Sequence, residues 1–317
     1  MQVTIAPDYL RRFSDALAQL AVGEDERIML AVSGGPDSLA LLLLAHHHAA
    51  GRMTAATVDH RIRPESADEA IYVGKICKQL DISHLVLSPA REIKGNIQSS
   101  ARAARYALLE SAADENGCSV IATAHHSDDQ LETLLMRIAR GSGVDGLASI
   151  RARNGRIVRP LLGFSKLELE EICADAGIEP VRDPSNDNPD FDRVAIRQWL
   201  AASNHPFRNE RTNRTVRAIT EAAEALAWVT DDLAAQRINK ENKEIQLDSA
   251  NIPHDLKRRL LLRCLSQLEP DLKPRGDAID RLIMELGAGK TAMIGNILCR
   301  GGVKWTFSVA PPRRADS

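Results

Sequence analysis

The sequence predicts an α/β fold: a Rossmann-like domain with a parallel sheet, followed by a second, smaller α+β domain. Two observations predict it. Short apolar runs alternate with helical segments four times in the first half of the chain, and the alternation stops near residue 150. The length of 317 residues suits two domains rather than one.

The first half of the chain contains four predicted strands and the helices between them. Apolar runs predict strands at residues 27–32 (RIMLAV), 53–59, 83–87 and 119–124. Helical patterns occupy residues 7–20, 38–49, 65–80, 96–116 and 128–140. Right-handed crossovers make such strands parallel, and ligands of parallel sheets bind outside the carboxyl ends of the strands. We therefore expect the site near Ser33, His60, Ser88 and His126.

The second half changes in character. Asn154-Gly155 lies between two short runs and predicts a hairpin within residues 150–162. Turn-forming residues fill 183–192, which we expect to be a loop. Helices are expected at 166–176, 212–238, 254–268 and 277–286, with short strands up to Val309. The boundary is placed at the start of the long helix, giving domains of residues 1–211 and 212–317.

Composition excludes several classes of protein. The net charge is −2, so any nucleic-acid contact must come from local basic clusters, and the 3% of aromatic residues argues against a sheet that stacks many bases on Phe and Tyr. The five cysteines form no C-x-x-C pair, which argues against a disulfide framework or zinc site and fits a reducing compartment. There is no signal-peptide pattern and no apolar stretch near the roughly 20 residues of a membrane span, so we expect a soluble cytoplasmic protein with no membrane partner.

One loop has the features of a phosphate-binding site. It follows a predicted buried strand, opens a helix, and consists of Ser33, Gly34, Gly35, Pro36, Asp37 and Ser38. Its glycines allow close approach to phosphate oxygens, and the amides at the helix N-terminus attract anions. The serine hydroxyls add donors, and Asp37 suits a Mg²⁺ ion bridging the phosphates. The strand–loop–helix context favours this interpretation over a plain turn.

Two other glycine-rich segments match nucleotide motifs only in their letters. Residues 141–146 (GSGVDG) follow a helix rather than a strand, so we expect a flexible loop beside the active site. Residues 287–291 (GAGKT) resemble the end of a P-loop, but no strand precedes them. We expect a turn in the second domain.

A polar cluster follows the fourth strand and contains His125, His126, Asp128, Asp129 and Glu132. Two imidazoles and three carboxylates suit metal binding, and capping of the next helix by Ser127 or Asp128 is the alternative. Asp128 and Glu132 are four residues apart, so they are expected to share a helix face.

Two further pairs of polar residues are candidates for the site, and the first is expected at the same edge of the sheet. Asp59 and His60 end the second strand. Arg102 and Arg105 lie three apart on the helix at 96–116 and suit contact with a phosphate or carboxylate, or ordinary surface positions. Spacing alone does not separate those two interpretations.

Taken together, the motifs resemble one family. The motifs that carry the resemblance are SGGPDS at residues 33–38, VDH at 58–60, AR-x-x-RY at 101–106, TAHHSDDQLET at 123–133, RGSGVDGL at 140–147, RPLL at 159–162 and DPSN at 183–186. With them, the sequence closely resembles the tRNA(Ile)-lysidine synthetases, which are N-type ATP pyrophosphatases. The loop alone identifies only the superfamily. The run HHSDDQLET, together with RGSGVDGL and DPSN, is much more specific.

The resemblance implies a two-step ligase reaction that uses ATP and Mg²⁺. The C2 oxygen of the wobble cytosine in the CAU anticodon of tRNA(Ile) attacks the α-phosphate of ATP, and pyrophosphate leaves. The ε-amine of free L-lysine then displaces AMP, giving lysidine. The resemblance implies ATP contacts by the phosphate loop with Asp59 and His60, and catalytic or substrate-binding roles for Arg102, Arg105, His125, His126, Asp128, Asp129, Glu132 and Arg140. Three of these, Asp128, Asp129 and Glu132, are hypothesised to orient the lysine amine.

The chain departs from the family pattern in a few places. Arg61 follows VDH where the family usually has Gly. The family's Arg-Asn pair after DPSN appears here as Arg193-Val194, and Arg197 is retained. The second domain, which we expect to be an accessory tRNA-binding domain, matches only weakly. These departures concern local loop geometry rather than the ATP site.

Arginine clusters are the expected tRNA-binding surfaces. Arg151, Arg153, Arg156 and Arg159 lie in a hairpin without acids, and residues 193–217 contain six arginines against one glutamate. Such clusters follow phosphates and give salt-dependent binding, although each alone is more often a solvated face. The expected tRNA contacts are Arg151, Arg153, Arg193, Arg197, Arg208, Arg211 and Arg214.

Three other functions are weighed against this one. A tRNA thiolase belongs to the same superfamily but usually presents paired or catalytic cysteines. A metal-dependent phosphoesterase would not need SGGPDS, and a non-catalytic ATP-binding regulator would not need the polar cluster. ATP turnover that requires both tRNA and lysine separates all three from a lysidine synthetase.

Overall fold

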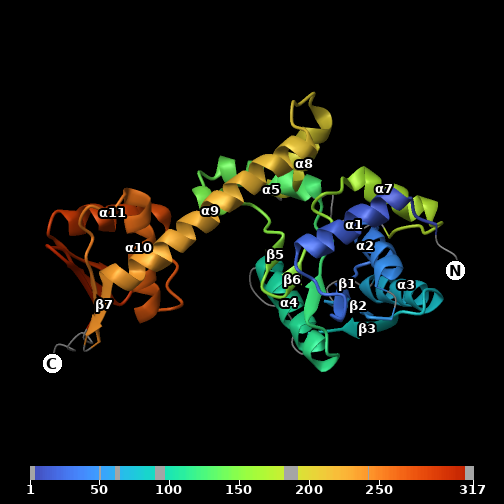
Figure 1. Ribbon diagram of the computed structural model, residues 1–317, viewed down its shortest axis with the longest axis horizontal. Coiled ribbons are helices and arrows are strands. Elements are labelled where there is room, and N and C mark those ends of the chain that lie inside the picture. The colour runs from blue at the N-terminus through green and yellow to red at the C-terminus, as the bar shows by residue number, and fades with distance from the viewer. Residues whose placement is uncertain are drawn as a thin grey trace. The chain divides into compact units, whose positions relative to one another are not determined.

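The computed structural model describes residues 4–49, 51–60, 65–89, 97–181, 192–241 and 243–310. It divides into two compact units, residues 1–220 and residues 221–317. The division falls inside helix α9 (Asn209–Arg237), whereas the boundary proposed from the sequence, 211/212, lies near the start of that helix. Each unit is described separately (Figure 1).

A six-stranded, mostly parallel sheet forms the centre of the first unit. Its order is β3 (Ser83–Leu87), β2 (Met53–Val58), β1 (Ile28–Ala31), β4 (Val120–Ala122), β6 (Ile157–Val158) and β5 (Arg153–Asn154). All neighbours are parallel except β5 and β6, which pair antiparallel around Gly155. The parallel sheet and the hairpin at Asn154-Gly155 are therefore confirmed.

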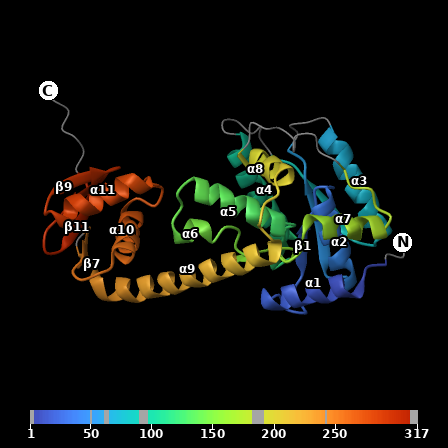
Figure 2. The ribbon, with the colours of Figure 1, turned by 90° about the horizontal axis from the view of Figure 1, so that it is seen from above.

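Alternate residues of the strands bury two opposite faces. Ile28 and Leu30 join one apolar core with α1 (Pro7–Gln19), α2 (Pro36–His48), α3 (Glu65–Gln79) and α7 (Lys166–Asp175). Met29 points the other way and packs with α4 (Ile97–Glu115), for example with Leu109. On the first face, α2 lies side by side with α1 and α7 (Figures 1 and 2). Because α2 is covered all round, every residue from Leu39 to Ala45 is buried, as its uniformly apolar sequence predicts.

The first unit contains three further helices. They are α5 (Ser127–Ala139), α6 (Val144–Leu147) and α8 (Asp192–Ala202). The prediction of a flexible loop at 141–146 is wrong in part, because Gly143 caps the short helix α6. Helix α8 was not predicted from the sequence, and its first residue, Asp192, is the last residue of the predicted loop at 183–192. The rest of that loop, with the DPSN motif, lies outside the described residues, as does Arg61.

The second unit contains a five-stranded antiparallel sheet. Its order is β7 (Ile238–Glu241), β8 (Glu244–Leu247), β11 (Trp305–Val309), β10 (Ile297–Arg300) and β9 (Thr291–Ile294). Helices α10 (His254–Leu268) and α11 (Gly276–Gly287) bury its core, in which Trp305 and Phe307 pack with Leu261 and Leu282. This arrangement confirms a second α+β domain.

Two local expectations in the second unit have clear outcomes. The long helix α9, seen along its length in Figure 2, begins three residues earlier than the expected 212 and ends at Arg237, where β7 starts. The GAGKT segment is a turn between α11 and β9, as expected, with Gly289 at φ +73°.

In the described part of the chain, no helix is long and apolar enough to cross a bilayer.

Candidate active site

The site lies where the strand order of the first sheet reverses. The chain passes from β1 to β2 and β3 on one side, while β4 pairs with β1 on the other side. In open parallel sheets, ligands bind in the crevice at this point, outside the carboxyl ends of the strands. Helices α2 and α5 begin there, directly after the loops that follow β1 and β4.

The phosphate loop is held open by its own backbone and hydroxyls. Gly34 adopts φ +89°, a conformation that suits glycine, and its carbonyl accepts a hydrogen bond of 3.0 Å from the amide of Val181. The hydroxyl of buried Ser38 accepts from the Ser33 amide at 3.1 Å and donates to the Gly35 carbonyl at 3.0 Å. Gly35 caps α2 and Pro36 occupies its first turn, so the free amides of that turn face an incoming anion.

His126 connects the phosphate loop to the polar cluster. Its Nε2 atom lies 3.6 Å from a carboxylate oxygen of Asp37 and 3.6 Å from one of Asp129. Its Nδ1 atom lies 3.4 Å from Asp128. Only 3% of His126 is exposed, so a buried imidazole stands between three carboxylates. Two motifs that are almost 90 residues apart in the chain thus form one site.

The charge of His126 is set by these neighbours. Burial alone would lower its pKa, but the carboxylates of Asp128, Asp37 and Asp129 outweigh burial and raise the pKa to about 10. Burial would likewise raise the pKa of Asp128, yet His126 and the Lys166 amide hold it well below its usual value. At neutral pH the ring is therefore an imidazolium and Asp128 is ionised.

This arrangement corrects two expectations about the cluster. His126, not Ser127 or Asp128, is the N-cap of α5, and the Asp129 carboxylate accepts from the His126 amide at 3.1 Å. Among the described residues, no group of three or more His, Cys, Asp or Glu side chains is arranged to hold a metal ion. A proton on His126 instead offsets part of the negative charge of the three carboxylates.

A single-carboxylate Mg²⁺ site is compatible with the loop. Mg²⁺ in nucleotide sites is usually held by one or two carboxylates together with the substrate phosphates. Asp37 lies in the first turn of α2, and its buried Oδ1 atom has no hydrogen-bond partner in the described part of the chain. Its chemistry and position therefore fit a ligand to phosphate-bound Mg²⁺.

Asp128 is positioned by two contacts that sequence reasoning missed. Its carboxylate accepts a hydrogen bond of 2.9 Å from the amide of Lys166, at the start of α7. It also accepts one of 3.3 Å from the side chain of Asn209, at the start of α9. Neither contact has a local sequence signal, because the partners lie 38 and 81 residues away.

Glu132 serves a different set of partners from Asp128, although the two were expected to share a face. Its buried carboxylate accepts two hydrogen bonds from Arg197 on α8, at 2.6 and 3.0 Å. Arg193 lies 3.6 Å from the same carboxylate and donates to Thr133 at 3.0 Å. Glu132 raises the pKa of Arg197, as expected for a two-bond ion pair. These two arginines, expected to bind tRNA, thus attach α8 to α5.

The remaining predicted site residues surround this centre. Asp59 follows β2 and accepts from Ser66 at 2.6 Å, and burial lowers the pKa of neighbouring His60. His125 contacts Thr123 at 3.1 Å, and burial lowers its pKa to about 4 against the charge of Asp129, so its ring is neutral.

The predicted arginines fall into two groups. Arg102 and Arg105 are exposed on α4, Arg140 pairs with Asp192, and Arg153 donates to backbone carbonyls of Leu20 and Ala21. By contrast, the described residues offer no ion-pair partner to a row of exposed arginines at the start of α9. This row consists of Arg208, Arg211, Arg214 and Arg217.

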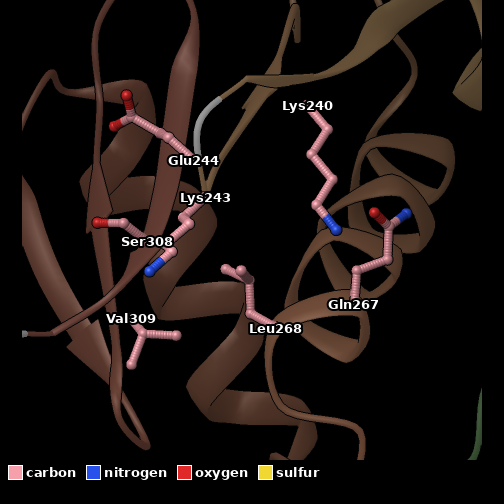
Figure 3. A pocket seen from close by; sticks show the side chains of 7 residues that line it. All are labelled: Lys240, Lys243, Glu244, Gln267, Leu268, Ser308 and Val309. Carbon is pink, nitrogen blue, oxygen red and sulfur yellow. The ribbon is translucent and has the colours of Figure 1, made fainter.

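A separate pocket of about 510 Å³ lies in the second unit (Figure 3). It is lined by side chains of β7, β8, α10 and β11 and by the turn between β7 and β8: Lys240, Lys243, Glu244, Gln267, Leu268, Ser308 and Val309. None of the predicted site residues reaches it.

Comparison with known proteins identifies the family. Residues 7–203 match the PP-loop domain family. The chain is 41% identical to a tRNA(Ile)-lysidine synthase of Zymomonas mobilis, with 96% of this chain and 95% of the relative covered. It is 39% identical to one of Novosphingobium aromaticivorans, with 93% of each covered.

Solved structures support the fold. The U34-tRNA thiolase NcsA of Methanococcus maripaludis is similar with a TM-score of 0.56 and 17% identity, over 68% of this chain and 78% of that chain. At this identity the likeness concerns the fold alone. The sequence relatives carry the assignment further: the chain belongs to the tRNA(Ile)-lysidine synthase family.

Proposed function

We propose that this enzyme converts the wobble cytidine of tRNA(Ile) with a CAU anticodon to lysidine, using ATP and free L-lysine. The observation that carries the proposal is the contact of His126 with Asp37, which joins the phosphate loop to the HHSDD cluster at the switch point of the sheet. A phosphate-binding loop needs no such cluster, whereas a ligase must activate one substrate and direct a second one to it.

The first step requires the triphosphate to be held and pyrophosphate to leave. The amides at the N-terminus of α2 and the hydroxyl of Ser33 suit the β- and γ-phosphates. The C2 oxygen of cytosine forms a bond to the α-phosphorus while the bond to the pyrophosphate oxygen breaks. When bound at Asp37, Mg²⁺ would offset the charge of the leaving pyrophosphate. The His126 imidazolium keeps Asp37 fixed despite the neighbouring carboxylates.

The second step brings in the lysine amine. The amine nitrogen bonds to C2, the C2–O bond breaks, AMP leaves, and the amine must lose a proton. Asp129 and Asp128 lie beside His126 at the crevice, so their carboxylates are suited to orient the ammonium group. Glu132 already accepts two hydrogen bonds from Arg197, and we assign it the task of holding α8 in place.

The test is pyrophosphate release from ATP–Mg²⁺, with and without unmodified tRNA(Ile) bearing CAU, and with and without lysine. The expected result is release that requires this tRNA, and incorporation of radiolabelled lysine into it. Release that requires another acceptor would keep the ATP-dependent chemistry and reject this substrate. An enzyme that binds ATP but releases no pyrophosphate with any tRNA would refute the proposal.

A further inference from the structure

We propose that Trp199, on the exposed side of α8, is a stacking platform for an unpaired base of the anticodon loop. The inference rests on the proposed function, because it takes tRNA as the substrate. It adds a base-binding residue to a site whose other predicted RNA contacts are all arginines.

The first step of the argument is the direction of α8. Its first residue, Asp192, pairs with Arg140 after the end of α5, and Arg197 then pairs with Glu132 in the middle of α5. Helix α8 therefore runs antiparallel to α5, back toward the N-terminus of α5, where His126 caps the helix. The two helices lie side by side in both views (Figures 1 and 2).

The second step places Trp199 between two anchors of the site. Two residues before it, Arg197 holds Glu132, and ten residues after it, Asn209 holds Asp128. The segment from Arg197 to Asn209 thus leaves the wall of the site and returns to it. Trp199 lies on this segment, between the two anchors, with its ring on the solvent-exposed side of α8.

The third step is exposure and charge. Trp199 is 52% exposed, so its ring is accessible to a flat partner such as a nucleic-acid base. No acidic residue occurs from 193 to 209, and the exposed Arg208, Arg211 and Arg214 follow. An exposed ring in a positive, acid-free segment is complementary to a polyanion that presents flat bases. Single-stranded RNA loops are bound in this way, by bases stacked on aromatic side chains with basic residues on the backbone.

The chain contains a matched comparison for this residue. Trp228 on α9 is 72% exposed, but Glu224 lies one turn before it and Asp231 and Asp232 lie one turn after it. An acidic surrounding repels RNA. Trp305, the third tryptophan, is buried in the core of the second unit. Exposure alone would select Trp228, whereas exposure together with charge selects Trp199.

The experiment measures binding of an unmodified tRNA(Ile) CAU transcript to the full chain and to W199A, W199F and W228A at several salt concentrations. Loss of one stacked base weakens binding about five- to thirtyfold in W199A. W199F retains most of the affinity because it keeps an aromatic face, and W228A binds like the wild type. The salt dependence of W199A stays unchanged, because stacking releases no counterions. A transcript with 2-aminopurine in the anticodon loop shows fluorescence quenching with the wild type that W199A loses.

The outcomes separate this inference from the proposed function. If the wild type forms lysidine and W199A binds tRNA equally well, the stacking role is refuted and the function stands. If W199A binds weakly but the wild type forms no lysidine, the function is refuted and the stacking role stands. A wild type that binds no tRNA refutes both. Equal weakening in W228A and W199A would also refute the inference, because it would show a general effect of exposed aromatic rings.

Discussion

The buried His126 predicts an unusual dependence of stability on alkaline pH. The pKa of its ring is raised to about 10 by the three carboxylates around it, against about 6.5 in the unfolded chain. A group with a raised folded pKa stabilises the protein fully below the unfolded pKa, and the contribution is lost as the pH rises through the folded pKa. The window for this loss is therefore pH 6.5 to 10.

The size of the effect follows from the same values. One pKa unit corresponds to about 1.4 kcal/mol, so the difference between the folded and unfolded pKa values sets an upper bound of about 5 kcal/mol. We expect about 2 to 4 kcal/mol by pH 9.5, because Asp128 shares the interaction that raises the pKa of His126. Exposure of the ring is only 3%, so solvent screens the interaction little.

The assay is urea unfolding at pH 6.5 and 9.5 for the wild type and for His126→Gln. The variant lacks the titrating ring but keeps a polar amide, and every other alkaline titration is common to both proteins. The difference in free energy of unfolding between the wild type and His126→Gln should be larger at pH 6.5 than at pH 9.5 by about 2 to 4 kcal/mol, in favour of the wild type. A stability difference that stays constant between these two values would refute the assignment of a charged imidazolium.

Three further predictions concern catalysis and RNA binding. Asp37→Asn should lower tRNA-dependent pyrophosphate release by about 100-fold or more while tRNA affinity stays within about twofold, because only the phosphate site loses a charge. Asn209→Ala removes one donor to Asp128, and turnover should fall about fivefold, as for the loss of one hydrogen bond of about 1 kcal/mol. Asn209→Asp should lower turnover further, because its carboxylate repels Asp128. Equal turnover in both variants would contradict the positioning role. Changing Arg208, Arg211 and Arg214 together to alanine should weaken tRNA binding and reduce the logarithmic salt slope by about 2 to 3, so an unchanged slope would exclude the row as a phosphate contact.

The sequence predicted the elements that are determined locally. The alternation of apolar runs and helical segments predicted the parallel sheet, and the helix at 254–268 has the same bounds in the structure. The phosphate loop was also predictable, because its chemistry is encoded in six consecutive residues. Strands β7 and β8 were not predicted, although Ile245 and Leu247 alternate with polar residues and both are buried, which is a signal for β8.

The contacts that organise the site were not predictable from one sequence. Serine and aspartate are better helix caps than histidine, so local rules favoured Ser127 or Asp128 for α5. The distant carboxylate of Asp37 lies beside the His126 ring and competes with this local preference. In the same way, Arg197 looked like an RNA contact because no local signal announces Glu132, which is 65 residues away in the chain.

The fold shared with a tRNA thiolase does not determine what attacks the activated base. Sulfur transfer requires an accessible thiolate or cluster ligand, and all five cysteines of this chain are free and buried. Burial raises the pKa of Cys77 and of Cys173 to about 12, so these thiols stay protonated and unreactive at neutral pH. The groups around His126 at the crevice include the carboxylates of Asp128 and Asp129, and a carboxylate orients an ammonium group but supplies no sulfur. This contrast supports the proposal that the phosphate loop activates the base and that the side chains at the start of α5 direct an amine, rather than a sulfur donor, to it.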